Sequence, residues 1–331
     1  MGSPTGAPRA AALALWLVLP ILLPARAAAQ MLMPGGPGTF DPFRVQATWV
    51  PGSGGSPSLT DVTARGAIPL SRTETDTWTA GLYAADTHLG GDLRLAPARP
   101  PIPRDLLGID ANLAYTHRLE GSRSLSFTVG VGALSDEPFH SIHETSLNAS
   151  GTYLLPTSGG NAWLLGLNFS NARPALNYVP LPIVAWLWRK PEHGLDGVLG
   201  IPFARLHWQP HPRWEVQLAA VIPARFEGEV SFRPLEVIRV SAGFRWDQQF
   251  WQLARRADTS KLLFYDSKRV EAGVEVPLLR PLALRVSGGY AFDRSFFEGT
   301  SVFERGDRVD LGASPFAAVT LQVRPAAARG P

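Results

Sequence analysis

One short stretch of the chain carries the residue types of acid–base chemistry: His140, His143, Glu144 and Ser146. A carboxylate beside a histidine can orient it as a general base, and the base can activate a serine hydroxyl as a nucleophile. Neighbouring residues on a strand point to opposite faces, however, so His143 and Glu144 would not meet on a regular strand. We therefore expect ordinary hydrogen bonding at a loop edge, and the sequence does not predict an enzyme.

Three other histidines, His193, His207 and His211, are the candidates for a metal site. His207 and His211 flank a turn that contains Pro210 and Pro212, and their spacing matches no common ligand pattern. The chain has no cysteine, which excludes thiolate ligands and disulfide bonds. The sequence therefore predicts no metal and no cofactor.

The densest polar and aromatic cluster lies near the C-terminus and consists of Tyr290, Asp293, Arg294, Phe297 and Glu298. In a functional interpretation, these residues form a recognition lip at an external mouth of the molecule. The alternative, which we favour, is an Asp–Arg pair that anchors the start of a long loop beneath a belt of aromatic residues.

A second charged set recurs at alternate positions over the C-terminal part of the chain. It consists of Arg239, Arg245, Arg269, Glu271, Glu275 and Arg285. On a hydrated inner surface, mixed charges of this kind would set the ion preference of a pore. The same side chains could equally pair with one another and close the space. Which of these holds depends on the elements that carry them.

Those elements are predicted by one repeating pattern that runs from about Phe43 to Val323. Stretches of about ten residues alternate apolar and polar side chains, and Gly/Pro turns separate them. Within Ser124 to Leu134, for example, Leu125, Phe127 and Val129 point one way, while serine, threonine and glycine point the other. A period of 2 excludes helices, and the pattern predicts antiparallel strands.

A soluble β-sandwich would also alternate, but two observations favour a membrane-spanning barrel. The polar face carries full charges of both signs, and tryptophans gather at strand ends, as at a membrane interface (Trp49, Trp78, Trp163, Trp208, Trp214 and Trp246). A strand crosses a bilayer in roughly 9–11 residues. We predict an all-β fold, an antiparallel up-and-down transmembrane β-barrel of about 12–14 strands, over residues 43–323, with short turns at one end and long loops at the other.

The first 29 residues read as an export signal, with Arg9 in the charged region, an apolar stretch from Ala10 to Leu23, and small residues at a cleavage site after Ala29. Residues 30–42 would then be a short N-terminal segment, and residues 324–331 a disordered tail. Removal of Arg9 and Arg26 lowers the formal net charge from +3 to +1. A nearly neutral chain gives no reason to expect nucleic acid as a partner.

Several stretches of the C-terminal half resemble an uncharacterised family of bacterial outer-membrane β-barrel proteins. They are Trp188–Pro191, Leu199–Phe203, Leu206–Pro210, Ser287–Arg294, Phe297–Gly299 and Arg308–Gly312. The resemblance implies a barrel in the bacterial outer membrane, and the family carries no activity that could be transferred. One departure is the tail after Val323, because barrel-assembly signals usually end the last strand with an aromatic residue at the chain terminus.

The sequence leaves two functional hypotheses open. The first is a passive or substrate-selective pore for small solutes, in which the charged set lines the lumen. The alternative is a non-conducting barrel with a structural, adhesive or binding role through its external loops. In either case the expected partners are outer-membrane lipid and, during biogenesis, the barrel-assembly machinery.

Overall fold

The computed structural model describes residues 30–33, 36–39, 43–52, 54–97, 99–256, 258–279 and 281–323. The predicted export signal at residues 1–29 and the predicted tail at residues 324–331 lie outside the described residues, and the segment 30–42 is described only in part. Within these ranges, no helix is long and apolar enough to cross a membrane.

Nearly all of the described chain is β-structure. The strands are β1 (Gln30–Met33), β2 (Gly36–Thr39), β3 (Phe43–Val50), β4 (Leu59–Arg72), β5 (Asp76–Leu89), β6 (Asp105–Arg118), β7 (Ser124–Ser135), β8 (Thr145–Pro156), β9 (Ala162–Ser170), β10 (Leu181–Lys190), β11 (Leu195–Ile201), β12 (Phe203–His211), β13 (Trp214–Val221), β14 (Arg225–Leu235), β15 (Ile238–Trp251), β16 (Leu262–Leu279), β17 (Leu282–Gly299), β18 (Arg308–Asp310) and β19 (Ser314–Val323). Single 3-10 turns occur at η2 (Glu120–Ser122), η3 (Ser158–Gly160) and η4 (Pro191–His193).

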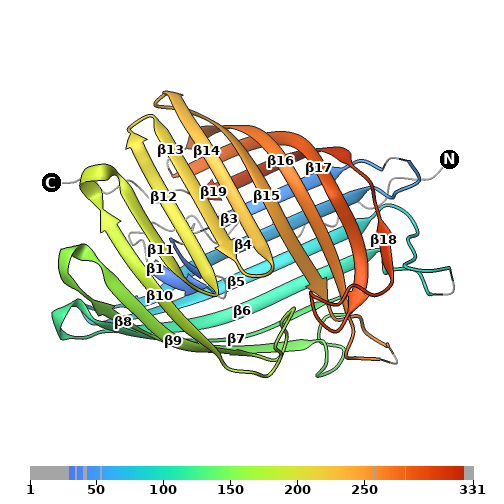
Figure 1. The fold of residues 1–331 in the computed structure, drawn as a ribbon, viewed down its shortest axis with the longest axis horizontal. Coiled ribbons are helices and arrows are strands. Elements are labelled where there is room, and N and C mark those ends of the chain that lie inside the picture. Colours follow the sequence, from blue (N-terminus) through green and yellow to red (C-terminus); the bar gives the residue numbers. More distant parts are fainter. Residues whose placement is uncertain are drawn as a thin grey trace.

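The strands from β3 to β19 close into an antiparallel barrel in which each strand pairs with its neighbours in the sequence (Figure 1). The ring closes where β19 pairs with β3, with Ala317 opposite Trp49. β18 has only three residues and pairs with β17. Because β17 also pairs directly with β19, 16 of these 17 strands form the wall. The predicted fold class is confirmed, but the predicted number of 12–14 strands is too low.

The predicted number is too low because several strands are short and closely connected, and the sequence pattern is weakest there. β11 and β12 are joined by a single residue, Pro202, and β13 and β14 by residues 222–224. β11 has 7 residues and β13 has 8. Such short strands hold only three or four alternations each, and no long loop marks the boundary between them.

The connections differ sharply between the two ends of the barrel (Figure 1). At one end, here the turn end, the links contain two to five residues, and both β3 and β19 have their outer termini there. At the other, the loop end, the longer connections gather: residues 51–58, 90–104, 136–144, 171–180, 252–261 and 300–313. An even number of strands returns both ends of the barrel sequence to the same side.

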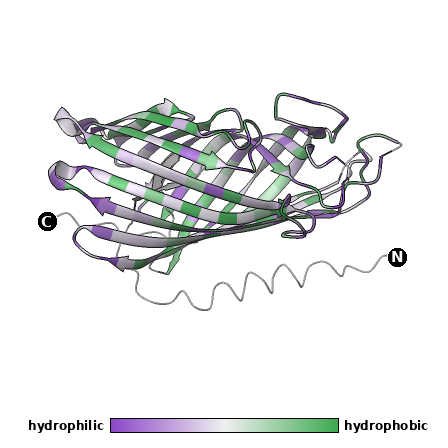
Figure 2. Cartoon of the chain, turned by 90° about the horizontal axis from the view of Figure 1, so that it is seen from below, coloured by the Kyte–Doolittle hydropathy of each residue, from purple (hydrophilic) through white to green (hydrophobic). Residues whose placement is uncertain are grey.

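The outer face of the barrel is apolar. Figure 2 shows hydrophobic and hydrophilic residues alternating along the strands. Large apolar side chains such as Val129, Leu167 and Val286 stay more than half exposed. Five of the six tryptophans predicted at strand ends, all but Trp246, are also among the exposed residues. A continuous exposed apolar surface of this extent fits contact with lipid rather than with water.

Candidate functional site: a charged lumen beneath an apolar mouth

The pairing register places the six predicted pore-lining residues on the inner face of the wall. Arg239 lies opposite Glu275, which in turn lies opposite Arg285, and Arg245 lies opposite Arg269. Their sequence neighbours Val240, Val270 and Val286 are among the large exposed apolar residues of the outer face. Since successive side chains of a strand alternate between faces, the charged set from β15, β16 and β17 points into the lumen.

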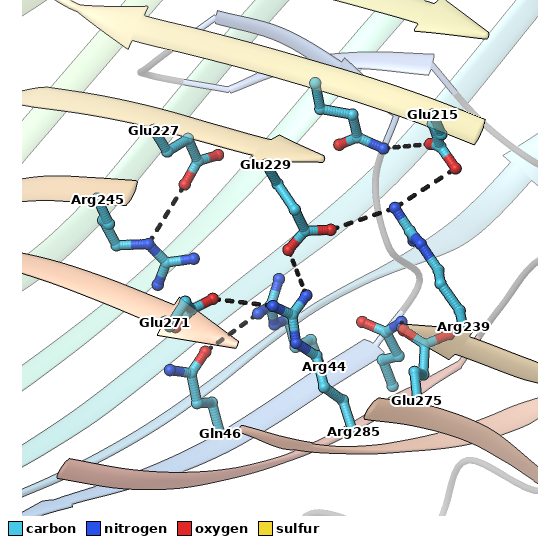
Figure 3. Close-up of polar contacts among 12 residues, drawn as sticks. Arg44, Gln46, Glu215, Glu227, Glu229, Arg239, Arg245, Glu271, Glu275 and Arg285 are labelled. Carbon is cyan, nitrogen blue, oxygen red and sulfur yellow. Dashed lines mark hydrogen bonds and ion pairs between the residues drawn. The ribbon is translucent and has the colours of Figure 1, made fainter. Parts of the chain in front are cut away.

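Three of these residues are joined by a network that runs across four strands (Figure 3). Glu229 of β14 accepts hydrogen bonds from Arg239 at 3.2 Å and from Arg285 at 2.5 Å. Arg285 also donates to Glu271 at 2.9 Å. Gly273 leaves room for this reach, because a Cβ atom there would lie 3.1 Å from Arg285 Nε. The four side chains form an alternating chain of acids and bases along the wall.

The remaining members of the predicted set have other contacts. Arg245 lies 3.6 Å from Glu227, and Glu275 accepts a hydrogen bond from Gln322 at 2.9 Å. Arg269 faces the ring of Phe316 at 5.8 Å. The set is therefore one surface, but it is not one network.

Two carboxylates at the centre of this surface, Glu227 and Glu229, were not among the predicted pore-lining residues. The signal was present, because residues 225–233 alternate charged or polar side chains with Phe226, Val230 and Phe232. Glu215 extends the surface further. It lies 3.4 Å from Arg239 and 3.2 Å from His207, which is itself 2.7 Å from Asp196.

At the loop end, the lumen is closed by a buried apolar cluster, which we term the apolar mouth. Its members face inward from β3–β6 and β15–β19 or come from three of the long loops: Val50, Leu59, Leu89, Leu93, Leu95, Ile102, Leu106, Trp251, Leu253, Leu263, Tyr265, Ala291, Phe296, Leu311, Phe316 and Ala318. None is more than 8% exposed. The inner surface thus changes from charged to apolar along the barrel axis.

The start of the loop of residues 252–261, directly after β15, contacts β7, which lies across the ring from β15 in the strand order. Gln252 N donates to the carbonyl oxygen of Leu134, and Ala254 N donates to Asp136 Oδ1, both at 2.8 Å. Arg255 adds an ion pair with Glu137 at 3.0 Å. These contacts hold the loop across the mouth.

A cavity of about 310 Å³ lies over the apolar mouth, between this loop and residues 99–100. Its lining is rich in cations: Arg99, Pro100, Leu253, Arg255, Arg256, Asp258, Lys261, Leu263 and Glu298. Hydrogen bonds from the Ser260 hydroxyl and amide hold the pKa of Asp258 below its usual value. The side chain of Thr300, followed by its amide, lowers the pKa of the nearby Glu304 in the same way. Both carboxylates are therefore ionised at neutral pH.

The five residues of the predicted rim cluster do not come together. Tyr290 is exposed on the outer face, and Asp293 is exposed and binds Lys268 at 2.7 Å. Phe297 is buried in a stack with Phe264, with ring centroids 4.9 Å apart. The favoured Asp–Arg anchor is not among the ion pairs of the described residues.

The other two members of that cluster point toward the interior. Glu298 lies 3.5 Å from Arg256 and lines the external cavity. Arg294 is 1% exposed, and its Nε donates to the Tyr265 hydroxyl at 3.2 Å. Its position in the apolar mouth was not predicted, because an irregular backbone at Asp293, with φ of +48°, breaks the alternation there.

The histidine candidates are engaged in local contacts. The Ser141 hydroxyl, rather than Ser146, binds Glu144 at 2.5 Å, and His140 lies 3.3 Å from Glu137. Burial raises the pKa of Glu144, but hydrogen bonds led by that of Ser141 outweigh it and leave the pKa lowered. Among the residues that the structure describes, no group of three or more histidine or acidic side chains could hold a metal ion.

A second apolar strip lies on the inner face of the short strands. Leu164, Ile183, Ala185, Val198 and Phe203, from β9–β12, are each at most 8% exposed and pack together. The inner face therefore carries the charged set over β13–β17, whereas β9–β12 carry this apolar strip together with Asp196 and His207. The sequence pattern does not predict this apolar strip, because in short strands alternation separates the two faces but does not show whether the inner face is apolar or charged.

Comparison with known proteins gives no family. No family model matches the chain, and no curated protein matches it, so membership of the resembled family stays a prediction. Solved structures with some likeness include the β domain of the Bordetella autotransporter BrkA (11% identity, 85% of this chain and 97% of that chain, TM-score 0.29). OmpT, an outer membrane protein of Vibrio cholerae, matches with 9% identity over 85% and 96% of the two chains, at a TM-score of 0.30.

The TodX monoaromatic hydrocarbon channel is a further match, with 10% identity over 86% of this chain and 88% of that chain and a TM-score of 0.34. At these identities and TM-scores, the likenesses carry no argument about function. The fold of this chain rests on its own strand pairing.

Proposed function

We propose that this protein is an outer-membrane channel for small solutes, with selection at its external mouth. The observation that carries the proposal is the 16-strand wall with a charged inner surface. Barrels of about 8 strands are filled by their own side chains, whereas barrels of 16–18 strands are wide enough for an aqueous channel. A lumen of this width with acids and bases along one wall supports passage of polar or charged solutes.

The apolar mouth favours a selective channel over a passive one. Its side chains are almost fully buried, and an apolar constriction excludes ions because they would lose their hydration. Passage then requires movement of the loop 252–261. Polar contacts hold this loop to β7 and to Glu298, and Leu253 is buried in the apolar mouth. We propose this loop as the gate.

The same closed mouth favours a second candidate, a non-conducting barrel that binds ligands through its external loops. The cationic cavity above the mouth supports that candidate as well. The two functions differ in one measurable property, which is whether ions cross the barrel when the loop is removed.

The proposed location is the bacterial outer membrane, with the loop end outside and the turn end in the periplasm. Its support is the exposed apolar face together with the split between short turns and long loops. Outer-membrane lipid is then the proposed partner of the apolar face, and the barrel-assembly machinery the proposed partner during biogenesis.

Planar-bilayer recording of residues 30–331 tests the channel, compared with a variant in which residues 254–260 are replaced by two glycines. We expect unitary current steps from both proteins, with a higher open probability for the shortened loop. Heat-modifiable gel mobility would first establish that each barrel is folded. Silence from both folded proteins would contradict the channel and favour the binding barrel.

A further inference from the structure

Arg294 lies in the apolar mouth, just above the charged part of the lumen. It is 1% exposed, and its backbone oxygen accepts a hydrogen bond from Leu311 N at 2.8 Å. Around it are the mouth residues Tyr265, Phe296 and Leu311. A guanidinium group is therefore fixed inside a mainly apolar shell at the narrow part of the proposed channel.

The guanidinium of Arg294 is only partly satisfied by the protein. Its Nε donates to the Tyr265 hydroxyl, but neither Nη1 nor Nη2 has a hydrogen-bond partner among the described residues. An arginine stays protonated at any physiological pH, and burial of an unpaired ionised group is strongly unfavourable. Two adjacent, buried and unused donor groups are the arrangement that binds an anion.

Two further polar groups lie on the inner face of β16, the strand that pairs with β17. The hydroxyl of Ser267 is buried, has no partner among the described residues, and lies opposite the irregular segment of β17 that holds Arg294. Arg269, two residues further along the same face, is 8% exposed and contacts the Phe316 ring. Beside the two Nη groups of Arg294, β16 thus contributes a buried hydroxyl that has no partner among the described residues.

We infer that Arg294 binds the carboxylate of a small organic anion whose apolar body lies against the apolar mouth. The planar guanidinium matches a carboxylate through two parallel hydrogen bonds. The surrounding aromatic and leucine side chains favour an acyl or aryl group over a hydrated inorganic ion. The Arg294 binding site does not depend on the proposed channel function. The inference that such organic anions are the substrates of the channel rests on that function.

The external cavity supports the same ligand class. Glu298 and Leu263 line that cavity and belong to the same two strands as Arg294 and Ser267. Glu298, four residues beyond Arg294 on β17, is neutralised there by Arg256. An anion that enters through this cavity would pass Lys261 and two arginines that are each paired with one carboxylate, Arg99 with Asp307 and Arg255 with Glu137.

Equilibrium dialysis of radiolabelled octanoate tests the site, with the folded 30–331 protein in a neutral maltoside detergent. We expect saturable binding to the wild type and at least a tenfold weaker affinity for Arg294→Gln. Arg308→Gln, which alters an exposed arginine on β18, is the matched control and should bind like the wild type. Tyr265→Phe, which keeps the ring, should weaken binding about fivefold.

Competition by unlabelled compounds separates the ligand classes. Octanoate should compete, whereas acetate, chloride and octanol at equal concentration should not. Competition by acetate or chloride as strong as that by octanoate would overturn the apolar part of the inference. Equal octanoate binding by wild type and Arg294→Gln would overturn the site.

Stability provides a second readout that does not depend on the choice of ligand. Without ligand, Arg294→Met should raise the denaturant midpoint, because it removes a buried unpaired charge and keeps the volume. A lowered midpoint would mean that the protein itself satisfies the guanidinium, and the inference would fail. Octanoate binding without any current from the loop-shortened barrel would contradict the channel function but would still support the Arg294 site.

Discussion

At the scale of single residues, the lumen wall depends on a few arginines that each serve more than one carboxylate. Arg285 contacts both Glu229 and Glu271, and Arg239 contacts both Glu215 and Glu229. These side chains are between 11% and 22% exposed, so water screens their charges less than it would at an open surface. The field inside the barrel is therefore set locally by the balance of these five residues.

Removal of two of these cations should change the ion preference of the channel. In Arg239→Ala with Arg285→Ala, Glu229 and Glu271 lose these arginine contacts, Glu215 keeps Arg233 and His207, and the wall becomes net negative. We expect the permeability ratio of potassium to chloride to rise by roughly twofold or more, measured as the reversal potential in a salt gradient. Arg123→Ala, at an exposed turn, is the control, and an unchanged reversal potential in the double variant would show that ions do not pass this wall.

The sequence was informative about which of these residues face inward and uninformative about what they contact. Alternation fixes the face of Arg239, Arg245 and Arg285, because a one-residue shift would place charges in lipid. Contacts such as that of Arg285 with Glu229 join strands that are not neighbours, and no local pattern encodes them. Arg294 could not be placed at all, since the backbone irregularity before it reverses the phase.

At the scale of elements, the two longest strands can extend past the others because other residues pack against both of their faces. β16 and β17 have 18 residues each, well beyond the roughly 9–11 that cross a bilayer. Toward the loop end their inner face packs into the apolar mouth, and their outer face is covered by loops, with Val302 N bonded to the Pro174 oxygen. Both faces of these strand ends are buried, so apolar and polar residues do not alternate there and the sequence pattern does not mark them as strand.

The outer cover of these strand ends should contribute measurably to stability. Phe297 is fully buried between the ring of Phe264 and the guanidinium of Arg305. Phe297→Ala should lower the free energy of unfolding by about 3–5 kcal/mol, measured by guanidinium titration in detergent micelles. Phe303→Ala in the same loop region, where the side chain is 75% exposed, should change it by less than about 0.5 kcal/mol; equal effects would mean that the cover does not stabilise the strands.

At the scale of the whole molecule, the barrel combines a wide ring with a closed external mouth. The ring is a consequence of alternation along 16 strands, and its even number returns both ends of the barrel to one side. The mouth is a consequence of three long loops that turn inward and bury leucines against Trp251 and Phe296. Alternation predicts a closed antiparallel barrel. The inward fold of the loops depends instead on contacts between residues over 100 positions apart, such as Ala254 with Asp136.

We expect ions to cross this barrel only when the loop 252–261 leaves β7. Because the chain has no cysteine, a single engineered pair, Leu134→Cys with Gln252→Cys, can lock the two elements where their backbones are hydrogen-bonded. Bilayer current is recorded from the oxidised and then the reduced form, with the cysteine-free wild type as the control for the redox reagents. We expect no openings from the oxidised protein and restored openings after reduction; the same current in both forms would rule out gating by this loop.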